Sequence, residues 1–546
     1  MKILASINDR VVWGAPMLCL MLFTGVLFTV RTGFFQLRKF PHILKSTVFS
    51  HEKTSDDGVS PFAAMCQALA ATLGTGNIAG VSTALSIGGA GAVFWMWISA
   101  FFGMMTGFAE NVLGIFYRKK HGNRYIGGAM QYIRTGLSEN PKTRKLAKPL
   151  SIMYALLCVL AGFGMGNAAQ MNSAAEALKK SFGLPQIITG IVLAGLAALI
   201  VFGGVKRISS VTSKLVPLMS GFYIIGCMFI IVSNAKYIPE AFDAIIGSAF
   251  GARQIGGGMA GAAVKTAISM GFKRGVFSNE AGLGTSVFSH SQSRTKEPVV
   301  CGMWSVFEIF FDTIVMCTLT ALVLLVSPVC VDITTEIPQV TAQTQYFRLT
   351  ESERIITDGA ALPETLTVYG AHGEVLEASL PRELTYSNIM TIQGEERDGM
   401  IVSARIEPLR GVGLAESAFT AKFGRPAGAT LAILVAMFAF STVIGWSYFG
   451  GEATAFLFGD RSRRPFCVIF IAFSIVGACV NMTAAWNISD MLNGLMAIPN
   501  LIAVLILSPK VVKLTRDYCA RAFGKKHSFK SSEEKRSSRT RVSDGD

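Results

Sequence analysis

The stretch Gly74-Thr75-Gly76-Asn77-Ile78-Ala79-Gly80 places three glycines and two short polar side chains in an uncharged part of the sequence. No charged residue occurs between positions 58 and 109, which is room for two membrane-spanning helices of about 20 residues each. Glycine is a poor helix former and lets the backbone approach a ligand closely. Because irregular backbone at membrane depth persists only where protein or water satisfies it, the pattern predicts a span that unwinds at 74–77 around something small and polar. The alternative interpretation is a helix-packing face, since small residues let membrane helices approach one another.

Three side-chain amides, Asn167, Gln170 and Asn172, lie in the apolar segment 150–178. Asn167 and Gln170 are three positions apart, so on an α-helix they share a face. A carboxamide can bind an ammonium or a carboxylate group through hydrogen bonds without adding charge to the membrane. Both residues are therefore candidate ligands of a small polar molecule. The alternative is that they join neighbouring helices by interhelical hydrogen bonds.

Carboxylate and hydroxyl side chains mark two later apolar segments. Glu308 and Asp312 are four positions apart and share a helix face, where they would repel unless a cation or a proton lay between them. Ser441 and Thr442 offer hydroxyl oxygens suited to a hard cation such as sodium. Such hydroxyls also often bond back to their own helix, so this pair alone is a weak signal.

These residues need a scaffold of membrane helices, and the long uncharged runs supply one. The chain has 546 residues with 51 % apolar content. The apolar runs predict eleven spans, at about 11–30, 61–83, 92–117, 150–178, 185–204, 215–233, 255–272, 298–327, 427–450, 465–484 and 488–508.

The basic residues are distributed unevenly over the connections between these spans. With alternating sides assigned, 35 Lys and Arg residues fall on one side, 14 fall on the other, and Lys265 lies inside a span. Basic loops stay cytoplasmic, so the N-terminus is predicted outside and the C-terminus in the cytoplasm. This distribution accounts for the net charge of +15 without a nucleic-acid partner. The basic tail 509–546 is predicted to be disordered and cytoplasmic.

The order of the spans predicts an internal repeat. Without the first span, ten remain, and two groups of five necessarily have opposite orientations, as in an inverted-topology repeat. The span at 255–272 opens the second group and is glycine-rich, like the span at 61–83 that opens the first. Its stretch Ser269-Met270-Gly271-Phe272 is predicted as a second helix break. Interrupted spans at corresponding positions point to a transporter site near the membrane midplane.

Residues 328–426 are different in kind, because they are polar and carry 14 acidic against 8 basic residues. Strand-like stretches such as 365–369 and 400–405 predict a small β-rich insertion outside the membrane. The predicted domains are therefore helices 1–8 in 1–327, the insertion 328–426, helices 9–11 in 427–508 and the tail 509–546.

The sequence gives no support for an enzyme. It lacks the phosphate-binding loop, the zinc-protease motif, a Cys-x-x-Cys pair and the serine-hydrolase elbow. The six histidines form no metal-ligand pattern, so no cofactor is expected, and no metal other than a transported ion. A channel is harder to exclude, but paired broken helices favour alternating access.

Several motifs carry a specific resemblance to a known family. Residues 70–81, with 91–97 and 108–110, closely resemble the hallmark of the alanine or glycine:cation symporter family. Residues 274–284 are similar to that family's second signature, and 163–172 and 439–446 also match it. The resemblance covers nearly all spans and is expected to exclude 328–426.

The resemblance implies an all-α polytopic membrane protein with eleven transmembrane helices. These would form inverted five-helix repeats of the leucine-transporter-like kind plus one extra N-terminal helix, with the small β-rich insertion outside the membrane. It also implies uptake of a small neutral amino acid of the alanine or glycine class across the plasma (bacterial inner) membrane, coupled to sodium or protons. The partners would be the amino acid, the ion and the lipid bilayer.

The resemblance also implies where the ligands bind. By analogy, the substrate lies against Thr75, Gly76 and Asn77, against the break at 269–272, and against Gln170. A cation is expected between the backbone oxygens freed from Gly74 to Ala79 and the hydroxyls of Ser441 and Thr442. Asp312 matches an acidic position of the family and is expected as a counter-charge.

Three features depart from the family's pattern. Lys265 replaces a small residue, Gly107 stands where a lysine is usual, and the insertion replaces a short loop. Lys265 is expected either to face the cavity, where its ammonium could mimic a bound cation or release a proton, or to reach the outer interface. Sodium is the favoured ion because the family's neutral oxygens remain. The alternatives are a proton-coupled transporter, or a transporter-derived amino-acid sensor that uses 328–426.

Overall fold

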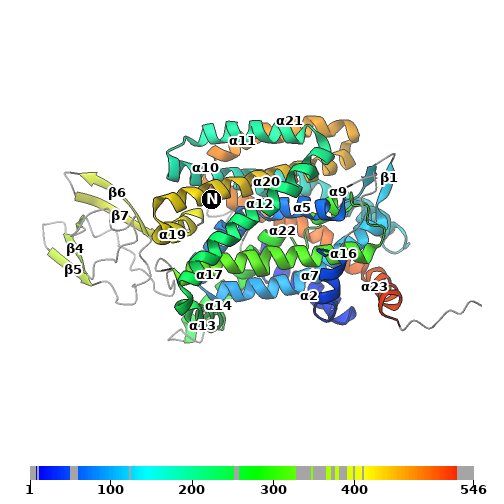
Figure 1. Ribbon diagram of the computed structural model, residues 1–546, viewed down its shortest axis with the longest axis horizontal. Coiled ribbons are helices and arrows are strands. Elements are labelled where there is room, and N and C mark those ends of the chain that lie inside the picture. Colours follow the sequence, from blue (N-terminus) through cyan, green and yellow to red (C-terminus); the bar gives the residue numbers. More distant parts are fainter. Residues whose placement is uncertain are drawn as a thin grey trace, which may run out of the picture.

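The helices of this protein form one bundle in which most long helices run in a common direction (Figure 1). The structure is a computed structural model. It describes residues 8, 12–49, 59–121, 124–250, 257–327, 346–348, 365–369, 375–379, 390–397, 400–408 and 411–524.

The helical elements fall into two runs along the chain. The first run is α2 (Ala15–Arg31), α3 (Phe35–Arg38), α4 (Phe40–Ser46), α5 (Pro61–Thr72), η2 (Thr75–Asn77), α6 (Ala79–Gly88), α7 (Gly91–Tyr117), α8 (Ala129–Ser138), α9 (Arg144–Phe163), η3 (Gly164–Ala168), α10 (Ala169–Phe182), α11 (Gln186–Val201), α12 (Gly204–Ser233), η4 (Ala235–Tyr237) and α13 (Ile238–Ala249). The second run is α14 (Gly257–Asn279), α15 (Ser286–His290), α16 (Pro298–Ile309), η5 (Phe310–Cys317), α17 (Thr318–Val326), α19 (Val412–Phe423), α20 (Arg425–Phe458), η7 (Asp460–Ser462), α21 (Arg463–Cys479), α22 (Met482–Ile506) and α23 (Ser508–Phe523).

Each of the eleven apolar ranges predicted from the sequence contains a helix. Among the described residues, seven continuous helices are long and apolar enough to cross a membrane: Gly91–Tyr117, Arg144–Phe182, Gly204–Ser233, Pro298–Val326, Pro426–Phe458, Asp460–Cys479 and Ala485–Ile506. Two shorter apolar helices, α2 and α11, fill two further ranges. The last two ranges hold the interrupted pair α5–α6 and the glycine-rich α14. The chain is therefore an integral membrane protein.

The predicted break in the first glycine-rich span is confirmed. Ser60 caps α5 by accepting a hydrogen bond from the Ala63 amide at 3.1 Å, and Pro61 occupies the first helical turn, where its missing N–H costs nothing. The helix ends at Thr72, and Gly74 has an extended backbone (φ −120°, ψ −156°). A single 3₁₀ turn, η2, then leads into α6. The chain is unwound at the place where three glycines in seven residues make a helix least favourable.

Two other helices are continuous but locally widened. Between α9 and α10, the segment η3 is a π-helical turn that contains the sequence Gly-Met-Gly-Asn-Ala. Between α16 and α17, the segment η5 is a π-helical stretch of eight residues that contains Asp312. Such bulges often mark functional sites, because they turn side chains away from the regular helix face.

The second break does not lie where the sequence predicted it. Residues 269–272 are inside the continuous helix α14, which runs to Asn279. The chain leaves helical geometry only at 280–285, where Glu280, Gly282 and Gly284 all have positive φ (56°, 92° and 71°). The glycines that permit a left-handed backbone thus lie in the motif 274–284, downstream of the stretch predicted to break.

Helix α7 is the centre of one packing layer and contacts α2, α14 and α16. Glycines allow these close approaches: a Cβ atom at Gly271 would lie 2.5 Å from the Ala92 carbonyl oxygen. A Cβ at Gly107 would lie 2.6 Å from Ser305 Oγ and 2.7 Å from Ile309 Cδ1. A lysine at position 107 would not fit against α16, which explains the departure at this position in packing terms.

The strands form one two-stranded hairpin and one five-stranded sheet. β1 (Lys119–His121) and β2 (Arg124–Ile126) form an antiparallel hairpin after α7. β3 (Tyr346–Arg348), β4 (Thr365–Tyr369), β5 (Val375–Ser379), β6 (Met390–Arg397) and β7 (Met400–Pro408) form one antiparallel sheet in the order β5-β4-β3-β7-β6.

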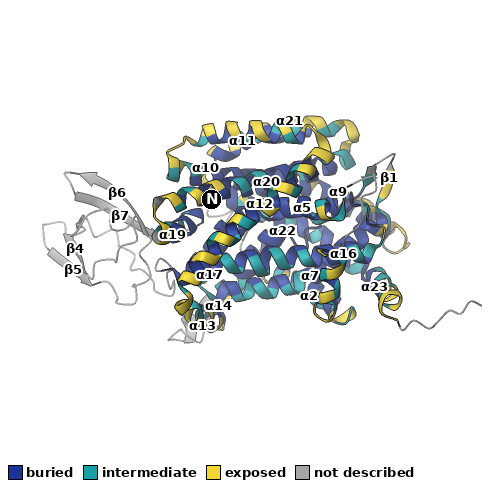
Figure 2. Ribbon diagram, viewed as in Figure 1, coloured by how far each residue is buried: buried dark blue, intermediate teal, exposed yellow. Residues whose placement is uncertain are grey.

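The buried residues run through the centre of the bundle, and exposed residues gather on its outer helices and loops (Figure 2). α11 and α21 pack against each other along one edge and present many exposed apolar side chains. Exposed apolar surface on long apolar helices is what a lipid-facing edge requires.

Candidate functional site

The unwound segment is held first by Gln170 of α10. Its Oε1 atom accepts hydrogen bonds from the Thr75 amide at 3.0 Å and from Thr75 Oγ1 at 2.9 Å. Its Nε2 atom donates to the Met165 carbonyl oxygen in the π-helical turn at 3.2 Å. All three residues are buried. The Gln170 side chain therefore accepts a hydrogen bond from a backbone N–H that the helix break leaves unpaired. It also connects the break to η3.

Asn77 holds the other end of the unwound segment, and all its polar atoms have partners. Its Oδ1 accepts from the Gly74 amide at 3.2 Å, and its carbonyl oxygen accepts from Thr320 Oγ1 at 2.7 Å. Its Nδ2 lies within hydrogen-bonding distance of Ser278 Oγ (2.8 Å) and of Asp312 Oδ1 (2.9 Å) and O (3.0 Å). Asn77 thus joins the first break to α14 and to η5.

Asp312 is fully buried and surrounded by neutral donors. Besides Asn77, Ser278 Oγ donates to Oδ2 at 2.5 Å and Thr313 Oγ1 donates to Oδ2 at 2.9 Å. Asn279 extends this network by donating to Thr313 Oγ1 at 3.0 Å. Within the described residues, the carboxylate has hydrogen bonds in place of an ion pair. Asp312 therefore accepts hydrogen bonds from residues of η2, α14 and η5 and connects these three segments.

The hydroxyl of Thr442 on α20 lies against the start of the break. A Cβ atom at Gly74 would lie 2.6 Å from Thr442 Oγ1 and 2.8 Å from Gln170 Oε1, so only glycine fits there. Both Ser441 Oγ and Thr442 Oγ1 donate to the Phe438 carbonyl oxygen, at 2.8 Å and 3.1 Å. This is the back-bonding arrangement that the sequence left as an alternative. It uses the hydroxyl hydrogen and leaves oxygen lone pairs free to accept or to bind a cation.

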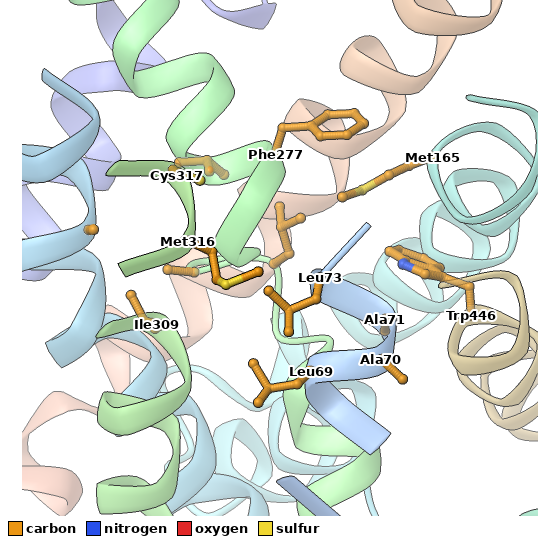
Figure 3. Packing of buried hydrophobic residues seen from close by; sticks show 14 of the residues in the cluster. Leu69, Ala70, Ala71, Leu73, Met165, Phe277, Ile309, Met316, Cys317 and Trp446 are labelled. Atoms are coloured by element: carbon orange, nitrogen blue, oxygen red, sulfur yellow. The ribbon is translucent and has the colours of Figure 1, made fainter. Parts of the chain in front are cut away.

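Apolar side chains enclose the end of α5 next to this polar centre. Figure 3 shows Leu69 of α5 and Leu73, which follows that helix, near Met316 of η5, with Cys317, Phe277 and Met165 beyond. The side chain of Phe277 packs on Gly76, where a Cβ would lie 3.0 Å from its ring. Water is excluded by this packing, and electrostatic interactions inside it are stronger than in solvent.

The structure does not bring Asn167 to the break. Because η3 widens the helix, Asn167 Nδ2 donates to the Phe470 carbonyl oxygen on α21 at 2.7 Å, while Gln170 points to Thr75. Asn172 likewise donates to the Val480 carbonyl oxygen at 2.5 Å. For these two asparagines, interhelical hydrogen bonding describes the geometry. The predicted common face of Asn167 and Gln170 is wrong.

Ser269, Met270, Gly271 and Phe272 also lie away from the first break. Gly271 packs on the Ala92 carbonyl oxygen, Met270 packs on Gly88, and the rings of Phe272 and Trp95 are 6.4 Å apart. The part of α14 that faces the unwound segment is one to two turns later, at Phe277 and Ser278. Ala79 begins α6 and is buried, and its carbonyl oxygen accepts from Thr83 Oγ1 at 2.7 Å.

One further expectation needs correction. Glu308 and Asp312 do not form a carboxylate pair around a shared ion, because Glu308 Oε2 lies 3.0 Å from His290 Nε2 on α15 while Asp312 bonds Asn77 and Ser278. Glu308 lies in α16, before the π-helical stretch that starts at Phe310 and contains Asp312. The Lys265 side chain is exposed, which is compatible with a position at the outer interface and with one facing an accessible cavity.

Sequence reasoning missed several residues of the site. Ser278, Thr313 and Thr320 all hydrogen-bond the Asn77–Asp312 pair. Ser278 lies in the second signature motif and Thr313 follows Asp312, so their positions were the available signal. Lys273 and Arg274 were also missed. They lie 3.0 Å and 2.7 Å from Asp490 Oδ2 and form a buried ionic cluster between α14 and α22.

The comparison with known families decides the identity of this chain. The sequence profile of the sodium:alanine symporter family matches residues 1–356 and 389–532. The chain belongs to the sodium:alanine symporter family. Its members are cation-coupled amino-acid symporters, and the helical bundle with its interrupted span is the expected scaffold. The match reaches further into 328–426 than predicted, because within that segment only residues 357–388 fall outside it.

Individual relatives cover almost the whole chain. Sodium/alanine symporter AgcS of Methanococcus maripaludis is 36 % identical over 94 % of this chain and 96 % of its own length. A probable sodium/glutamine symporter of Bacillus subtilis is 29 % identical over 94 % of this chain and 90 % of its own. Among solved structures, MhsT in complex with L-phenylalanine superposes with a TM-score of 0.50 and 11 % identity, covering 85 % of this chain and 99 % of that one. This likeness shows the leucine-transporter-like fold.

Proposed function

We propose that this symporter imports a small neutral amino acid of the alanine or glycine class together with sodium, by alternating access across the plasma membrane. Eleven membrane-spanning helices, with the N-terminus outside and the C-terminus in the cytoplasm, are part of this proposal. The observation that carries it is the buried break at 74–77, braced by Gln170 on one side and by Asn77 on the other.

In this proposal, the amino-acid substrate lies against the unwound backbone. A helix break supplies peptide groups that are not used within a helix, and such groups bind the carboxylate and ammonium of an amino acid in transporters of this architecture. Thr442 and Phe277 lie close to Gly74 and Gly76, so a small substrate side chain would displace these neighbours least. Gln170 and Asn77 position the backbone for this role.

In this proposal, the sodium ion lies between the start of the break and α20. Sodium prefers oxygen ligands, and Thr442 Oγ1 lies beside Gly74 with lone pairs available. These ligands are neutral, so they bind a cation without first losing a proton. Asp312 contributes negative charge from within the Asn77–Ser278 network and does not touch Thr442 in any contact of the described residues.

Uptake of labelled alanine into proteoliposomes tests the proposal. We expect accumulation that requires an inward sodium gradient and stops when choline replaces sodium at fixed pH. Full uptake without sodium that is abolished by collapsing the proton gradient would instead support proton coupling. Saturable alanine binding without uptake under either gradient would support the sensor alternative.

A further inference from the structure

A cavity of about 290 Å³ lies at the end of the bundle where the α11–α12 turn meets the α20–α21 turn. Its walls include Phe202 and Ile208 on one side, Tyr448 and Glu452 on α20, and Arg463 and Arg464 on α21. It shares no lining residue with the site around Gly74–Asn77. A volume of this size holds a small molecule or a lipid headgroup.

The cavity has a basic wall. Arg463 pairs its two terminal nitrogens with Glu452 (3.0 Å) and Asp460 (2.5 Å), but its Nε atom is buried and has no hydrogen-bond partner among the described residues. Arg464 lines the cavity and is exposed. Arg207 is outside the cavity lining but lies against Gly203, which lines the opposite side, since a Cβ at Gly203 would lie 2.2 Å from Arg207 Cδ. The described structure gives neither Arg207 nor Arg464 a carboxylate partner, so their charges remain available to an anion.

The cavity continues into an apolar surface. α11 ends at the cavity and α21 begins there, and the two helices pack side by side along one edge of the bundle (Figure 1). That edge carries exposed apolar side chains on both helices: Ile187, Ile191, Val192, Leu196, Leu199, Val468, Ile469 and Val476. In a membrane protein such a face contacts acyl chains. The basic cavity therefore lies where the lipid-facing edge ends, at the level of the headgroups.

We propose that this cavity binds the phosphate headgroup of an anionic phospholipid, whose acyl chains lie on the α11–α21 edge. Arginine matches phosphate because its planar guanidinium donates two parallel hydrogen bonds. Both turns belong to connections that the charge distribution assigns to the cytoplasmic side, and basic pockets between helices on that side suit anionic lipid headgroups. The apolar edge distinguishes a lipid from a soluble phosphate, which would have no use for it.

A charge-matched pair of variants tests this inference on the full-length protein in detergent. The double variant R207Q/R464Q removes the two available guanidinium groups. The control K206Q/R461Q removes the same charge from adjacent, exposed positions in the same two connections. Binding of phosphatidylglycerol and of phosphatidylcholine is measured by native mass spectrometry.

We expect the wild-type protein and the control to bind phosphatidylglycerol at least about tenfold more tightly than phosphatidylcholine. The R207Q/R464Q variant should lose this preference, with its binding of phosphatidylcholine unchanged. An equal loss in both double variants would show diffuse charge attraction and overturn the proposed site. If a double variant does not fold, the single variants R464Q and R461Q make the same comparison.

Inorganic phosphate forms the second arm of the experiment. We expect an excess of phosphate to leave bound phosphatidylglycerol in place and to leave the unfolding temperature of the protein unchanged. Complete displacement of the lipid by phosphate, with equal thermal stabilisation, would assign the cavity to a soluble anion and overturn the lipid. None of these measurements depends on which amino acid or ion is transported.

Discussion

Asn77 Nδ2 lies 2.9 Å from Asp312 Oδ1, although the two residues are 235 positions apart in the sequence. The contact joins the unwound part of the first glycine-rich span to the π-helical stretch of another. Ser278 at the end of α14 completes it by donating to the second carboxylate oxygen of Asp312 at 2.5 Å. Three segments of the bundle thus meet at one buried carboxylate.

Exchanging the amide and the carboxylate of this contact tests whether their pairing supports substrate binding. We expect Asn77→Asp to abolish uptake, because it places a second carboxylate against Asp312 in a buried site. The double variant N77D/D312N restores one amide facing one carboxylate and should recover part of the substrate binding. Binding is measured by isothermal titration of purified protein. Equal loss in the single and the double variant would show that Asp312 acts through other partners.

Gln170 braces the other side of the break. Gln170→Ala removes the acceptor of two hydrogen bonds and leaves the Thr75 amide buried without a partner, which costs about 1–3 kcal/mol. We expect the apparent substrate affinity to fall roughly 5- to 150-fold. The control is Asn172→Ala on the same helix, since Asn172 bonds the Val480 carbonyl oxygen away from the break. A similar loss of affinity in both variants would point to a general loss of helix packing.

The hydroxyl of Thr442 is expected to set the sodium affinity. Thr442→Val keeps the shape of the side chain but removes the oxygen beside Gly74, so the sodium concentration for half-maximal uptake should rise roughly tenfold. Thr442→Ser keeps the oxygen and should stay close to wild type. An unchanged sodium dependence in the valine variant would remove Thr442 from the cation site.

Glycine at position 74 is required by its contacts with two side chains of neighbouring helices. Gly74→Ala would place a Cβ atom 2.6 Å from Thr442 Oγ1 and 2.8 Å from Gln170 Oε1. We expect uptake to be lost, while Gly195→Ala on α11, where a Cβ would meet nothing within 4 Å, should be tolerated. Surface expression and thermal stability of both variants separate loss of function from loss of fold. Normal uptake by the Gly74 variant would mean that the break rearranges freely.

The segment that falls outside the family match should be dispensable for transport. Replacing residues 357–388 by a short Gly/Ser linker removes β4 and β5 and leaves all the helices in place. We expect a stable protein with measurable alanine uptake. A well-folded deletion variant that no longer binds the amino acid would place part of the substrate site in this segment.

The class of protein and the location of the first break follow from the amino-acid sequence alone. Long uncharged runs place helices in lipid, because no water is available there to satisfy an open backbone. The glycines at 74, 76 and 80 lower helix propensity locally, and the structure unwinds at that place. The motifs around these glycines also indicated the family, because a motif is compared residue by residue and needs no structure.

Which polar residues contact one another depends on the packing of the helices. Asn167 and Gln170 share a face on a regular α-helix, but the π-helical turn at Gly164–Ala168 rotates them toward different neighbours. Asp312 lies in the second π-helical stretch and contacts Asn77, whereas Glu308, in the regular helix before it, contacts His290. In α14, Ser278 faces the break and 269–272 do not, because Gly271 packs against α7. Helix periodicity predicts neighbours within one helix, whereas contacts between helices depend on bulges and crossing positions that no single segment encodes.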